Sequence, residues 1–497
     1  MILTCAAMRT LEEKAFAEGV SAEALMEEAG QKIARAVRQF FPAPGVCVAV
    51  FGKGNNGGDA LVAARHLAEA GWEVRLVAVF PDGDRAPLPA AKFTGARGCH
   101  TVSADEMRRC TGKPLVVLDG ILGIGAKGPL RAPVSDCTRA INRLRERGNA
   151  TVFALDLPTG LDGDTGIADP ACVVADFTLT IGFAKQGLVA DGAANFVGRL
   201  CVLPLRELTA RSETTAADAI PATPDVLAPL LPRRAFDSHK GDYGRIAILA
   251  GSPGYFGAAV LCATACVRAG AGLVTLYAAP DVAAVLSPRT PPEVMVRAMV
   301  SPAELLDLRH DVFAVGPGLG RHADADIFQL VEKIAQPMVL DADGLNAIAS
   351  NLEVLGKAAG ERVLTPHPGE MARLAPDAAS RSRRATVESF TRRFPCTLLL
   401  KGARTLVGKS GEPISINTTG TPGMAVGGMG DVLTGVLAAL IGQQVRPFDA
   451  ARLGAWLCGR AAEIAISHGG ESEESLTPSR VLDFLGAAFG DLRAACF

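Results

Sequence analysis

The chain has 497 residues, which predicts about two or three domains, each large enough to bury a core of its own. Charged residues make up 21% of it and hydrophobic residues 49%, which excludes a largely disordered chain. The formal net charge of −2 leaves no positive excess, so we expect neither nucleic acid nor a membrane surface as a partner.

The sequence predicts neither export nor insertion into a membrane. Its first residues carry charge from Arg9 onward without a basic leader segment, which is not the pattern of a signal peptide. The longest apolar stretch, 258–280, contains Arg268 and is expected to form a helix, a turn and a strand. The 12 cysteines form no CxxC pair, which favours free thiols in a reducing compartment. We therefore expect a cytoplasmic protein.

Apolar runs of strand length alternate with helix-period segments, the pattern of parallel sheets with helical crossovers. The first half has a helix expected over 60–71 and strands expected over 46–52, 73–80, 115–120, 151–158, 177–183 and 201–205. Residues rich in Ala, Thr and Pro follow, and we expect a linker there. The second half has helices expected from near Gly430 and over 450–467, and strands expected over 245–251, 273–278, 312–318, 338–344, 362–368 and 397–402. The predicted fold class is α/β, with two doubly wound domains over 1–210 and 236–497 and a linker over 211–235.

The run GKGNNGGD, residues 52–59, lies between an expected strand and an expected helix. Glycines allow a tight turn and a close approach of N–H groups to a ligand, and a helix N-terminus favours an anion. The run fits neither the GxGxxG nor the Walker A pattern. A turn needed only for packing would not require two asparagines and an aspartate, so we interpret it as a ligand-binding loop.

Asp119 and Asp156 each end an expected strand, and each is followed by a glycine-rich segment. In an open parallel sheet, ligands bind beyond the carboxyl ends of the strands, so these segments and the 52–59 run should converge on one crevice. A single acid in such a position often only caps a helix or a turn. Three equivalent positions favour a binding site.

Three motifs occur in order: GNNGGD with LVAARHL, then D-x-x-x-G-x-G, then LDLPTGLDGDTG. With them, the sequence resembles the N-terminal domain of the NAD(P)H-hydrate epimerases over about residues 1–210. The resemblance implies that Asp156 lies against the substrate and that a K⁺ ion, which oxygen ligands suit, is held by Asn56, Asp119 and Thr159. It implies that the hydrated dinucleotide contacts Asn55, Asn56, Gly57, Gly58, Asp59, Gly123, Ile124, Gly125, Ala126, Lys127, Gly128 and Pro129. The expected reaction interconverts the R and S hydrates by loss and re-addition of the ring hydroxyl, with Asp156 as acid and then base.

In the second half, GTPGMAVGGMGD, residues 420–431, precedes an apolar helix. Glycines at a helix N-terminus favour phosphates, and an aspartate in the first turn can take a proton from a hydroxyl nucleophile. A helix cap alone would not need so many glycines. The GxGD pattern resembles the ribokinase-like superfamily, whose members phosphorylate alcohols.

Five further motifs narrow the resemblance to the ADP- or ATP-dependent NAD(P)H-hydrate dehydratases, over about residues 230–495. They are HKGDYGR at 239–245, GPGLG, LDADGLNA, TPHPGE and LKGART. The resemblance implies that Asp431 is the catalytic base, with Mg²⁺ present and ADP as co-substrate, ATP remaining an alternative. It implies substrate contacts from Ala258, Gly320 and His367, and nucleotide contacts from Lys401, Gly402, Ala403, Arg404, Thr405 and Gly430. From the residues alone, His367 either lines a pocket or is structural, and Asp341 and Asp343 either ligate Mg²⁺ or cap a helix.

Together the resemblances imply a Rossmann-like sandwich followed by a ribokinase-like domain, and the repair of hydrated NADH and NADPH. The first domain would interconvert the R and S hydrates, and the second would dehydrate the S form, converting ADP to AMP and phosphate. We expect small-molecule partners only and a homo-oligomer. Two other interpretations remain: a vitamin or sugar kinase with a dinucleotide-sensing first half, or a first half that is a scaffold for RNA or protein. A stable phosphorylated product would favour the kinase.

Overall fold

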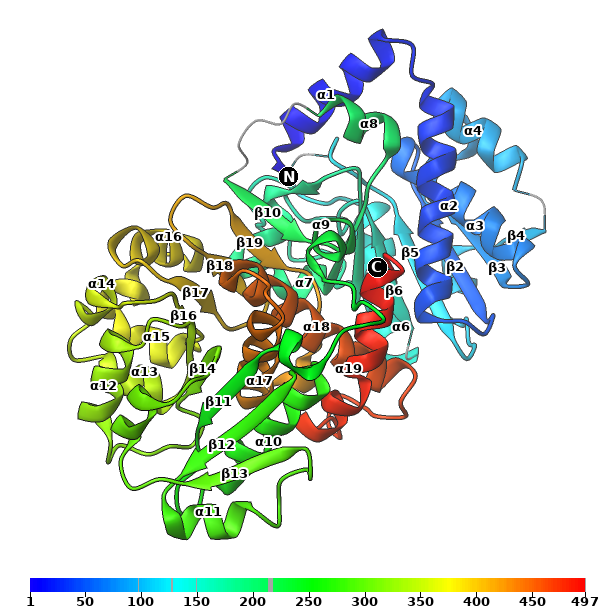
Figure 1. Cartoon of the computed structure of the whole chain (residues 1–497). Helices are drawn as coiled ribbons and strands as arrows, with labels where there is room; N and C mark the ends of the chain where they lie inside the picture. The colour runs from blue at the N-terminus through cyan, green and yellow to red at the C-terminus, as the bar shows by residue number, and fades with distance from the viewer. Residues whose placement is uncertain (97, 127, 149, 213–217, 497) are drawn as a thin grey trace. The chain divides into compact units, whose positions relative to one another are not determined.

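The computed structural model describes residues 1–96, 98–126, 128–148, 150–212 and 218–496. The chain divides into two compact units, residues 1–217 and 218–496, each with its own parallel or largely parallel sheet (Figure 1). The α/β fold class predicted from the alternation of strands and helices is therefore confirmed. None of the helices in the described ranges combines the length and the apolar character that a membrane span requires.

The first unit contains a seven-stranded sheet in which all neighbouring strands are parallel, in the order β4-β3-β2-β5-β6-β7-β9. Its strands are β2 (Val46–Phe51), β3 (Glu73–Ala78), β4 (Cys99–Thr101), β5 (Leu115–Gly120), β6 (Thr151–Leu155), β7 (Phe177–Ile181) and β9 (Arg199–Leu203). The strand order reverses between β2 and β5, so the loops after these two strands flank the position where open sheets bind ligands. A separate pair of strands, β1 (Ile2–Leu3) and β8 (Ala184–Lys185), is also parallel.

Helices cover both faces of this first sheet. Alternate residues of β2 enter different cores: Cys47 and Phe51 pack with α1, α2, α3 and α8, whereas Val48 and Val50 pack with α5 and α6. The helices are α1 (Cys5–Ala17), α2 (Ala22–Phe40), α3 (Asn55–Glu69), α4 (Pro87–Thr94), α5 (Ala104–Met107), α6 (Val134–Gly148), α7 (Ala194–Val197) and α8 (Arg206–Arg211). Helix α3 begins at Asn55, five residues before the start of the helix predicted over 60–71, so the GNNGGD run forms its first turn.

The second unit has a ten-stranded sheet in the order β10-β19-β18-β17-β16-β15-β14-β11-β12-β13. The pairs β17/β18 and β18/β19 are antiparallel and the others are parallel. The strands are β10 (Ala219–Ala222), β11 (Arg245–Leu249), β12 (Leu273–Ala278), β13 (Val294–Ala298), β14 (Val312–Val315), β15 (Met338–Leu340), β16 (Arg362–Leu364), β17 (Thr397–Leu400), β18 (Leu406–Gly408) and β19 (Ile414–Asn417). Here the order reverses between β11 and β14.

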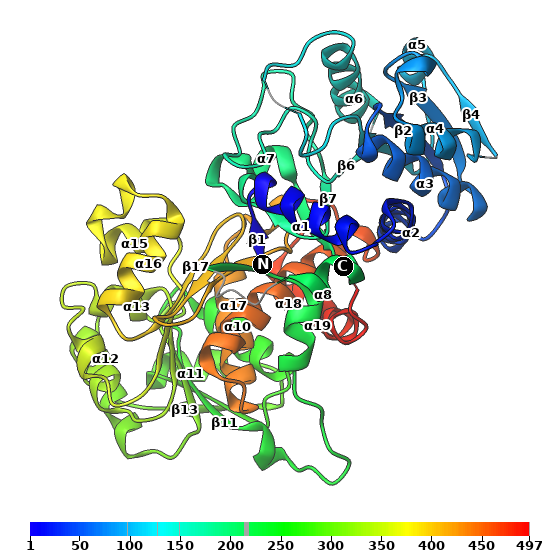
Figure 2. The same ribbon diagram turned by 90° about the horizontal axis from the view of Figure 1, so that it is seen from above.

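Two groups of helices flank this second sheet, one formed by α10, α17, α18 and α19 and the other by α12 to α16 (Figures 1 and 2). The helices are α9 (Pro224–Leu227), α10 (Phe256–Arg268), α11 (Pro280–Leu286), α12 (Asp324–Lys333), α13 (Asp343–Ile348), α14 (Val354–Lys357), α15 (Pro368–Leu374), α16 (Arg383–Arg393), α17 (Met429–Gly442), α18 (Pro447–Ser467) and α19 (Pro478–Arg493). Helix α19 was not among the predicted elements. Residues 219–222 lie in the segment expected to be a linker, but they form β10, which pairs with β19.

Helices α10 and α17 touch at Gly435, and this contact predicts a large effect of a small substitution. A Cβ atom at Gly435 would lie 2.1 Å from the carbonyl oxygen of Cys262 and 2.8 Å from the Cβ of Ala265. We expect Gly435→Ala to lower the free energy of unfolding by about 1–3 kcal/mol, measured by urea denaturation. Gly486→Ala in α19 is the matched control, because its Cβ meets no atom within 4 Å and should stabilise the helix by about 0.5–1 kcal/mol. Equal effects at the two positions would contradict the packing argument.

Candidate functional site

In the first unit, Asp119 lies at the end of β5 and is completely buried. Thr159 holds it, with the hydroxyl donating to Oδ1 (2.7 Å) and the backbone N–H donating to Oδ2 (2.8 Å). Burial raises the pKa of Asp119 to about 6, although the hydrogen bonds from Thr159 lower it. Two of the three expected K⁺ ligands are thus in direct contact, and they present oxygen atoms in a buried place.

Asn56, the third expected K⁺ ligand, stands in the first turn of α3. Its Nδ2 donates to the carbonyl oxygen of Leu122 (2.9 Å), and its Oδ1 is buried without a hydrogen-bond partner among the described residues. A Cβ atom at Gly123 would lie 3.4 Å from the Cβ of Asn56 and 3.7 Å from Oδ2 of Asp156. The loops after β2, β5 and β6 therefore meet at one point, as we expected from the strand ends. An unpartnered buried oxygen beside a buried carboxyl fits a cation bound by oxygen ligands.

The glycines of the GNNGGD run pack against protein atoms. A Cβ at Gly57 would lie 2.3 Å from the carbonyl oxygen of Gly52, and one at Gly58 would lie 2.5 Å from the Met26 side chain. Asp59 is buried, and burial together with the charges of nearby carboxylates raises its pKa well above its usual range. These contacts explain why the helix needs small residues here, and they leave Asn55 and Asn56 as the polar groups at its open end.

Asp156 follows β6 in the left-handed region, with φ of 65°, which is uncommon outside glycine and indicates a position under constraint. Its carboxylate accepts a hydrogen bond from the backbone N–H of Ile181 (3.2 Å) and forms an ion pair with Lys185. Lys185 is 1% exposed and also donates to the carbonyl oxygen of Ile181 (2.8 Å). Sequence reasoning missed Lys185, because no motif marks it and only the fold brings it to Asp156.

The 123–129 segment is held from the N-terminal helix. Arg9 in α1 donates to the carbonyl oxygen of Ile124 (2.6 Å), and Gly128 adopts φ of 84°. The N–H of Ala126 donates to the carbonyl oxygen of Gly123 (3.1 Å) and forms a turn. Lys127, which the resemblance places among the substrate contacts, lies outside the described residues. Contact of the 123–129 segment with a substrate stays a prediction.

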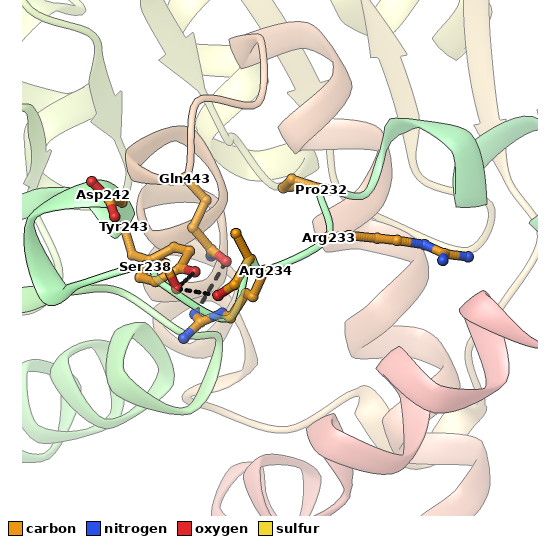
Figure 3. A pocket seen from close by; sticks show the side chains of 8 residues that line it. Pro232, Arg233, Arg234, Ser238, Asp242, Tyr243 and Gln443 are labelled. Atoms are coloured by element: carbon orange, nitrogen blue, oxygen red, sulfur yellow. Dashed lines mark hydrogen bonds between the residues drawn. The ribbon is translucent and has the colours of Figure 1, made fainter.

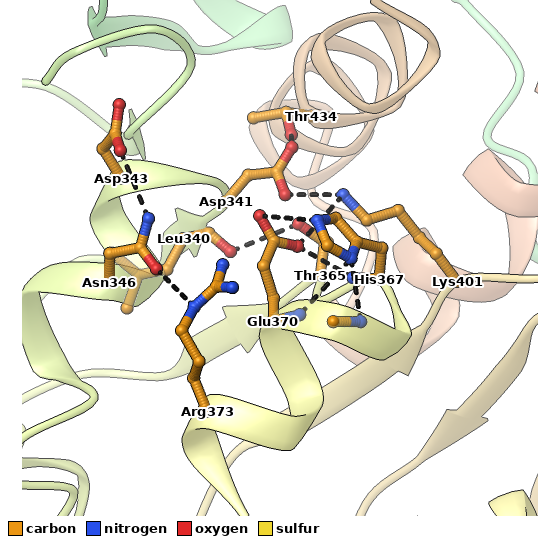
Figure 4. A network of polar contacts seen from close by, with 11 residues as sticks. Leu340, Asp341, Asp343, Asn346, Thr365, His367, Glu370, Arg373, Lys401 and Thr434 are labelled. Atoms are coloured by element: carbon orange, nitrogen blue, oxygen red, sulfur yellow. Dashed lines mark hydrogen bonds and ion pairs between the residues drawn. The ribbon is translucent and has the colours of Figure 1, made fainter. Parts of the chain in front are cut away.

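In the second unit, a buried ion pair joins Asp341 to Lys401 (Figure 4). Asp341, directly after β15, accepts from Nζ of Lys401 (2.7 Å) and from the hydroxyl of Thr434 in α17 (2.9 Å). Burial would raise the pKa of Asp341, but the charge and hydrogen bond of Lys401 hold it below its usual range. A Cβ at Gly430 would lie 3.0 Å from the Lys401 ammonium, so the expected nucleotide-binding residues Lys401 and Gly430 are neighbours.

Asp431 occupies the first turn of α17 and is half-buried. Burial, with the Asp341 charge adding to it, raises the pKa of Asp431 to about 7. Gly428 precedes this helix with φ of 99°, and a Cβ there would meet Leu261 and Pro478 at 2.8 and 2.9 Å. Only glycine suits that backbone, which aims the N–H groups of the helix start outward. The arrangement places a carboxyl that can exchange a proton near neutral pH at a helix N-terminus, a position that favours anions.

His367 caps helix α15. Its Nδ1 accepts from the N–H groups of Gly369 (3.0 Å) and Glu370 (3.3 Å), while its side chain remains 53% exposed. The carboxylate of Glu370 accepts a hydrogen bond from the backbone N–H of His367 (2.8 Å) and lies 3.9 Å from the Lys401 ammonium. The structure therefore supports the structural role of His367, and its exposed ring remains available to a ligand.

Ala258, near the start of α10, packs against Gly318 in the loop after β14, and Gly320 lies two residues farther along that loop. A Cβ at Gly318 would lie 3.0 Å from the Cβ of Ala258, and the Ser252 hydroxyl donates to the Gly318 carbonyl oxygen (2.8 Å). The N–H of Gly320 donates to Oδ2 of Asp343 (2.8 Å). Asp343 thus fixes this loop, and Asp341 is ion-paired, so neither carboxylate is free of protein partners.

Two arginines support the loops that are expected to bind nucleotide, Arg383 directly and Arg460 through Glu463. Arg383 donates to the carbonyl oxygens of Leu400 (3.2 Å), Lys401 (3.3 Å) and Ala403 (2.7 Å), which grips the segment expected to bind nucleotide at 401–405. Glu463 of α18 accepts from the N–H of Gly420 (2.9 Å) at the start of the glycine-rich loop. Arg460 in turn contacts Glu463 (3.0 Å) and Asp491 of α19 (2.7 Å). No sequence pattern identified these supports.

A cavity of about 290 Å³ lies in another part of the second unit, lined by Pro232, Arg233, Arg234, Ala235, Ser238, Asp242, Tyr243 and Gln443 (Figure 3). Arg234 lies over the ring of Tyr243, with Cζ 3.9 Å from the ring centroid. Part of the HKGDYGR motif thus lines this cavity, and none of the predicted site residues does.

Comparison with known proteins identifies both halves. Residues 22–187 match the family described as YjeF-related protein N-terminus, and residues 246–481 match the family described as NAD(P)H-hydrate dehydratase. The bifunctional NAD(P)H-hydrate repair enzyme of Moorella thermoacetica is 36% identical over 97% of this chain and 96% of its own length. The enzyme of the same name from Coxiella burnetii is 34% identical over 93% and 94%.

A solved structure also resembles the second unit. The ADP/ATP-dependent NAD(P)H-hydrate dehydratase from Bacillus subtilis, co-crystallised with ATP and Mg²⁺, has a TM-score of 0.50 and 26% identity. It covers 56% of this chain and 100% of its own length. The relatives match nearly the whole chain, and the two family models match its two halves in order. The chain therefore belongs to the family of bifunctional NAD(P)H-hydrate repair enzymes.

Proposed function

We propose that the first unit interconverts the R and S hydrates of NADH and NADPH at the Asp156 site, and that the second unit dehydrates the S hydrate with ADP. The chain is a bifunctional epimerase and nucleotide-dependent dehydratase by family. The observation that supports the residue assignment most directly is Asp431, a carboxyl with a pKa of about 7 at the N-terminus of α17, next to Lys401. A hydroxyl nucleophile and a phosphate fit those two groups.

In the second unit, Asp431 takes the proton of the ring hydroxyl, whose oxygen attacks the terminal phosphoryl group of ADP and releases AMP. The N–H groups around residues 428–430 stabilise the negative charge on the transferred group. Phosphate then leaves with the C–O bond electrons, and loss of a proton from the adjacent carbon forms the ring double bond of NADH or NADPH. Mg²⁺, when bound to the nucleotide, would neutralise phosphate charge.

The direct test follows the dihydronicotinamide absorbance during incubation of mixed R and S NADH hydrate with Mg²⁺, K⁺ and ADP. Recovery of nearly all NADH is expected, with AMP and phosphate formed in equal amounts. The same assay with ATP decides which nucleotide is preferred. Absence of recovery with either nucleotide would contradict the proposed function, and a stable phosphorylated product would favour the kinase alternative.

We also propose that Asn56, Asp119 and Thr159 hold a K⁺ ion, whose charge would favour the ionised form of the buried Asp119. The prediction is a K⁺-dependent increase in thermal stability compared with tetramethylammonium at equal ionic strength. A site with a dissociation constant of about 1 mM would add about 2.7 kcal/mol at about 100 mM K⁺. Asn56→Leu, which removes the unpartnered Oδ1, should lose the increase. An equal K⁺-dependent increase in thermal stability in the parent and in Asn56→Leu would argue against a cation at these residues.

A further inference from the structure

Helix α1 is fastened to the loops of the candidate epimerase site. The N–H of Cys5 donates to Asp164 (2.6 Å), and Arg9 donates to the carbonyl oxygen of Ile124 (2.6 Å). Directly before α1, strand β1 pairs with β8 so that Leu3 stands opposite Lys185, the partner of Asp156. One face of this helix is therefore turned toward the residues around Asp156.

Glu12 lies on that inner face of α1. The buried residues of the helix are Cys5, Met8 and Ala15, and Glu12 stands four residues after Met8 and three before Ala15. Glu12 is half-buried, and it forms no hydrogen bond or ion pair with any residue in the described ranges. Its neighbour Glu13 is exposed. A carboxyl kept inside without a protein partner is unusual, because burial of a polar group is costly unless something compensates it.

The proposed epimerisation needs two proton transfers. A proton must reach the departing hydroxyl on one face of the ring, and a base must take a proton from the water that adds to the other face. Asp156 already has a cationic partner in Lys185 and a donor in the Ile181 N–H. We propose that Glu12 is the second acid–base residue of the epimerase site and donates the proton to the departing hydroxyl. This inference rests on the proposed function of the first unit.

In the forward direction, the R hydrate becomes the S hydrate. The C–O bond of the hydrated carbon breaks, its electron pair leaves with oxygen, and the oxygen takes the proton of Glu12 and departs as water. The lone pair of the adjacent ring nitrogen forms a C=N bond, which gives a cation. A second water then adds to the same carbon from the opposite face, the C=N electrons return to nitrogen, and Asp156 takes the released proton. The reverse reaction uses the two carboxyls in exchanged roles.

The electrostatic surroundings agree with this assignment. Burial, followed by the charge of Asp156, raises the pKa of Glu12 to about 7, so both protonation states are populated near neutral pH. The charged groups that act on Glu12 are Asp156, Lys185, Arg9 and Glu13. Glu12 and Asp156 in turn raise the pKa of the buried Asp59.

The test compares E12Q with E13Q in the full chain, with R-NADH hydrate as substrate. An excess of the Asp156→Asn chain supplies dehydration without epimerisation, so that the tested chain limits the rate. After the enzyme-free rate is subtracted, E12Q is expected to be slower on the order of 10²-fold or more, and E13Q to equal the parent. With S-NADH hydrate and no added chain, all three should react equally. Parent-like epimerisation by E12Q overturns the proposal, whereas a parent that cannot use the R hydrate contradicts the proposed function.

The pH profile separates an acid from a residue that only supports the fold. An acid with a pKa of about 7 loses its proton as the pH rises, so the parent rate with the R hydrate should fall above about pH 7. E12D keeps a carboxyl and should keep a falling limb at a lower rate, and the residual rate of E12Q should lack it. A parent rate that stays level from about pH 6 to about pH 9 overturns the proposal even where E12Q fails to fold.

Discussion

The Asp431→Asn chain is expected to dehydrate the S hydrate more slowly than the parent, on the order of 10²-fold or more, with epimerisation unchanged. An amide cannot take the proton of the ring hydroxyl, while its size and its place in the first turn of α17 remain the same. The measurement is the rate of AMP and phosphate release from S-NADH hydrate and ADP. Near-normal turnover would remove Asp431 from the role of base.

The stability of the same variant provides its control. The folded chain holds the Asp431 proton up to about pH 7, whereas the unfolded chain releases it near 3.8, so folding free energy is lost as the pH rises through that range. Asp431→Asn removes this loss and should be more stable than the parent at pH 8, on the order of 1–2 kcal/mol, but not at pH 4. A variant that is merely misfolded would be less stable at both pH values.

The second large effect is expected for Asp156→Asn, which should abolish epimerisation and leave the second unit active. Mixed R and S hydrate would then return only about half of the NADH, apart from the slow enzyme-free interconversion. Asparagine accepts the left-handed backbone conformation of this position, so the substitution removes the charge without adding backbone strain. The measurement is the NADH plateau with mixed hydrate and its initial rate with the R hydrate.

Loss of Asp156 also leaves the buried Lys185 ammonium without its counter-ion, which is expected to cost stability. The double variant Asp156→Asn, Lys185→Met removes both charges and should regain most of that stability. It should not regain epimerisation. Full recovery of epimerisation in the double variant would show that Asp156 served only to neutralise Lys185.

Most central strands and the loops that follow them were predictable from the sequence, because buried parallel strands are continuous apolar runs and their polar ends stand out. Strands β4, β10, β13, β18 and β19 were not predicted. Asp119 and Asp156 were found in this way, and Asp431 from the glycines that precede an apolar helix; the structure brings the expected loops together within each unit. The roles of these residues in binding and catalysis stay predictions. The start of α3 was misplaced because asparagine and glycine resemble a loop, whereas here they are the small and polar residues that a tightly packed helix start requires.

Partners that come from distant parts of the chain could not be predicted. Glu12, Lys185 and Arg383 belong to no recognisable motif, and each lies on an element that the fold brings beside a loop of a candidate site. Their positions depend on strand register and helix packing, which a local pattern does not contain. Helix α19 was missed for a similar reason, because its amphipathic character matters only once α18 provides a surface for it.

Helix α19 does more than cover the core. A chain of polar contacts runs from its Asp491 through Arg460 and Glu463 to the backbone N–H of Gly420. Through it, the last helix is connected by charge to the opening of the glycine-rich loop, although the two are some seventy residues apart in sequence. If the proposed function holds, we expect a fusion that disturbs α19 to loosen the start of this loop and so to weaken nucleotide affinity.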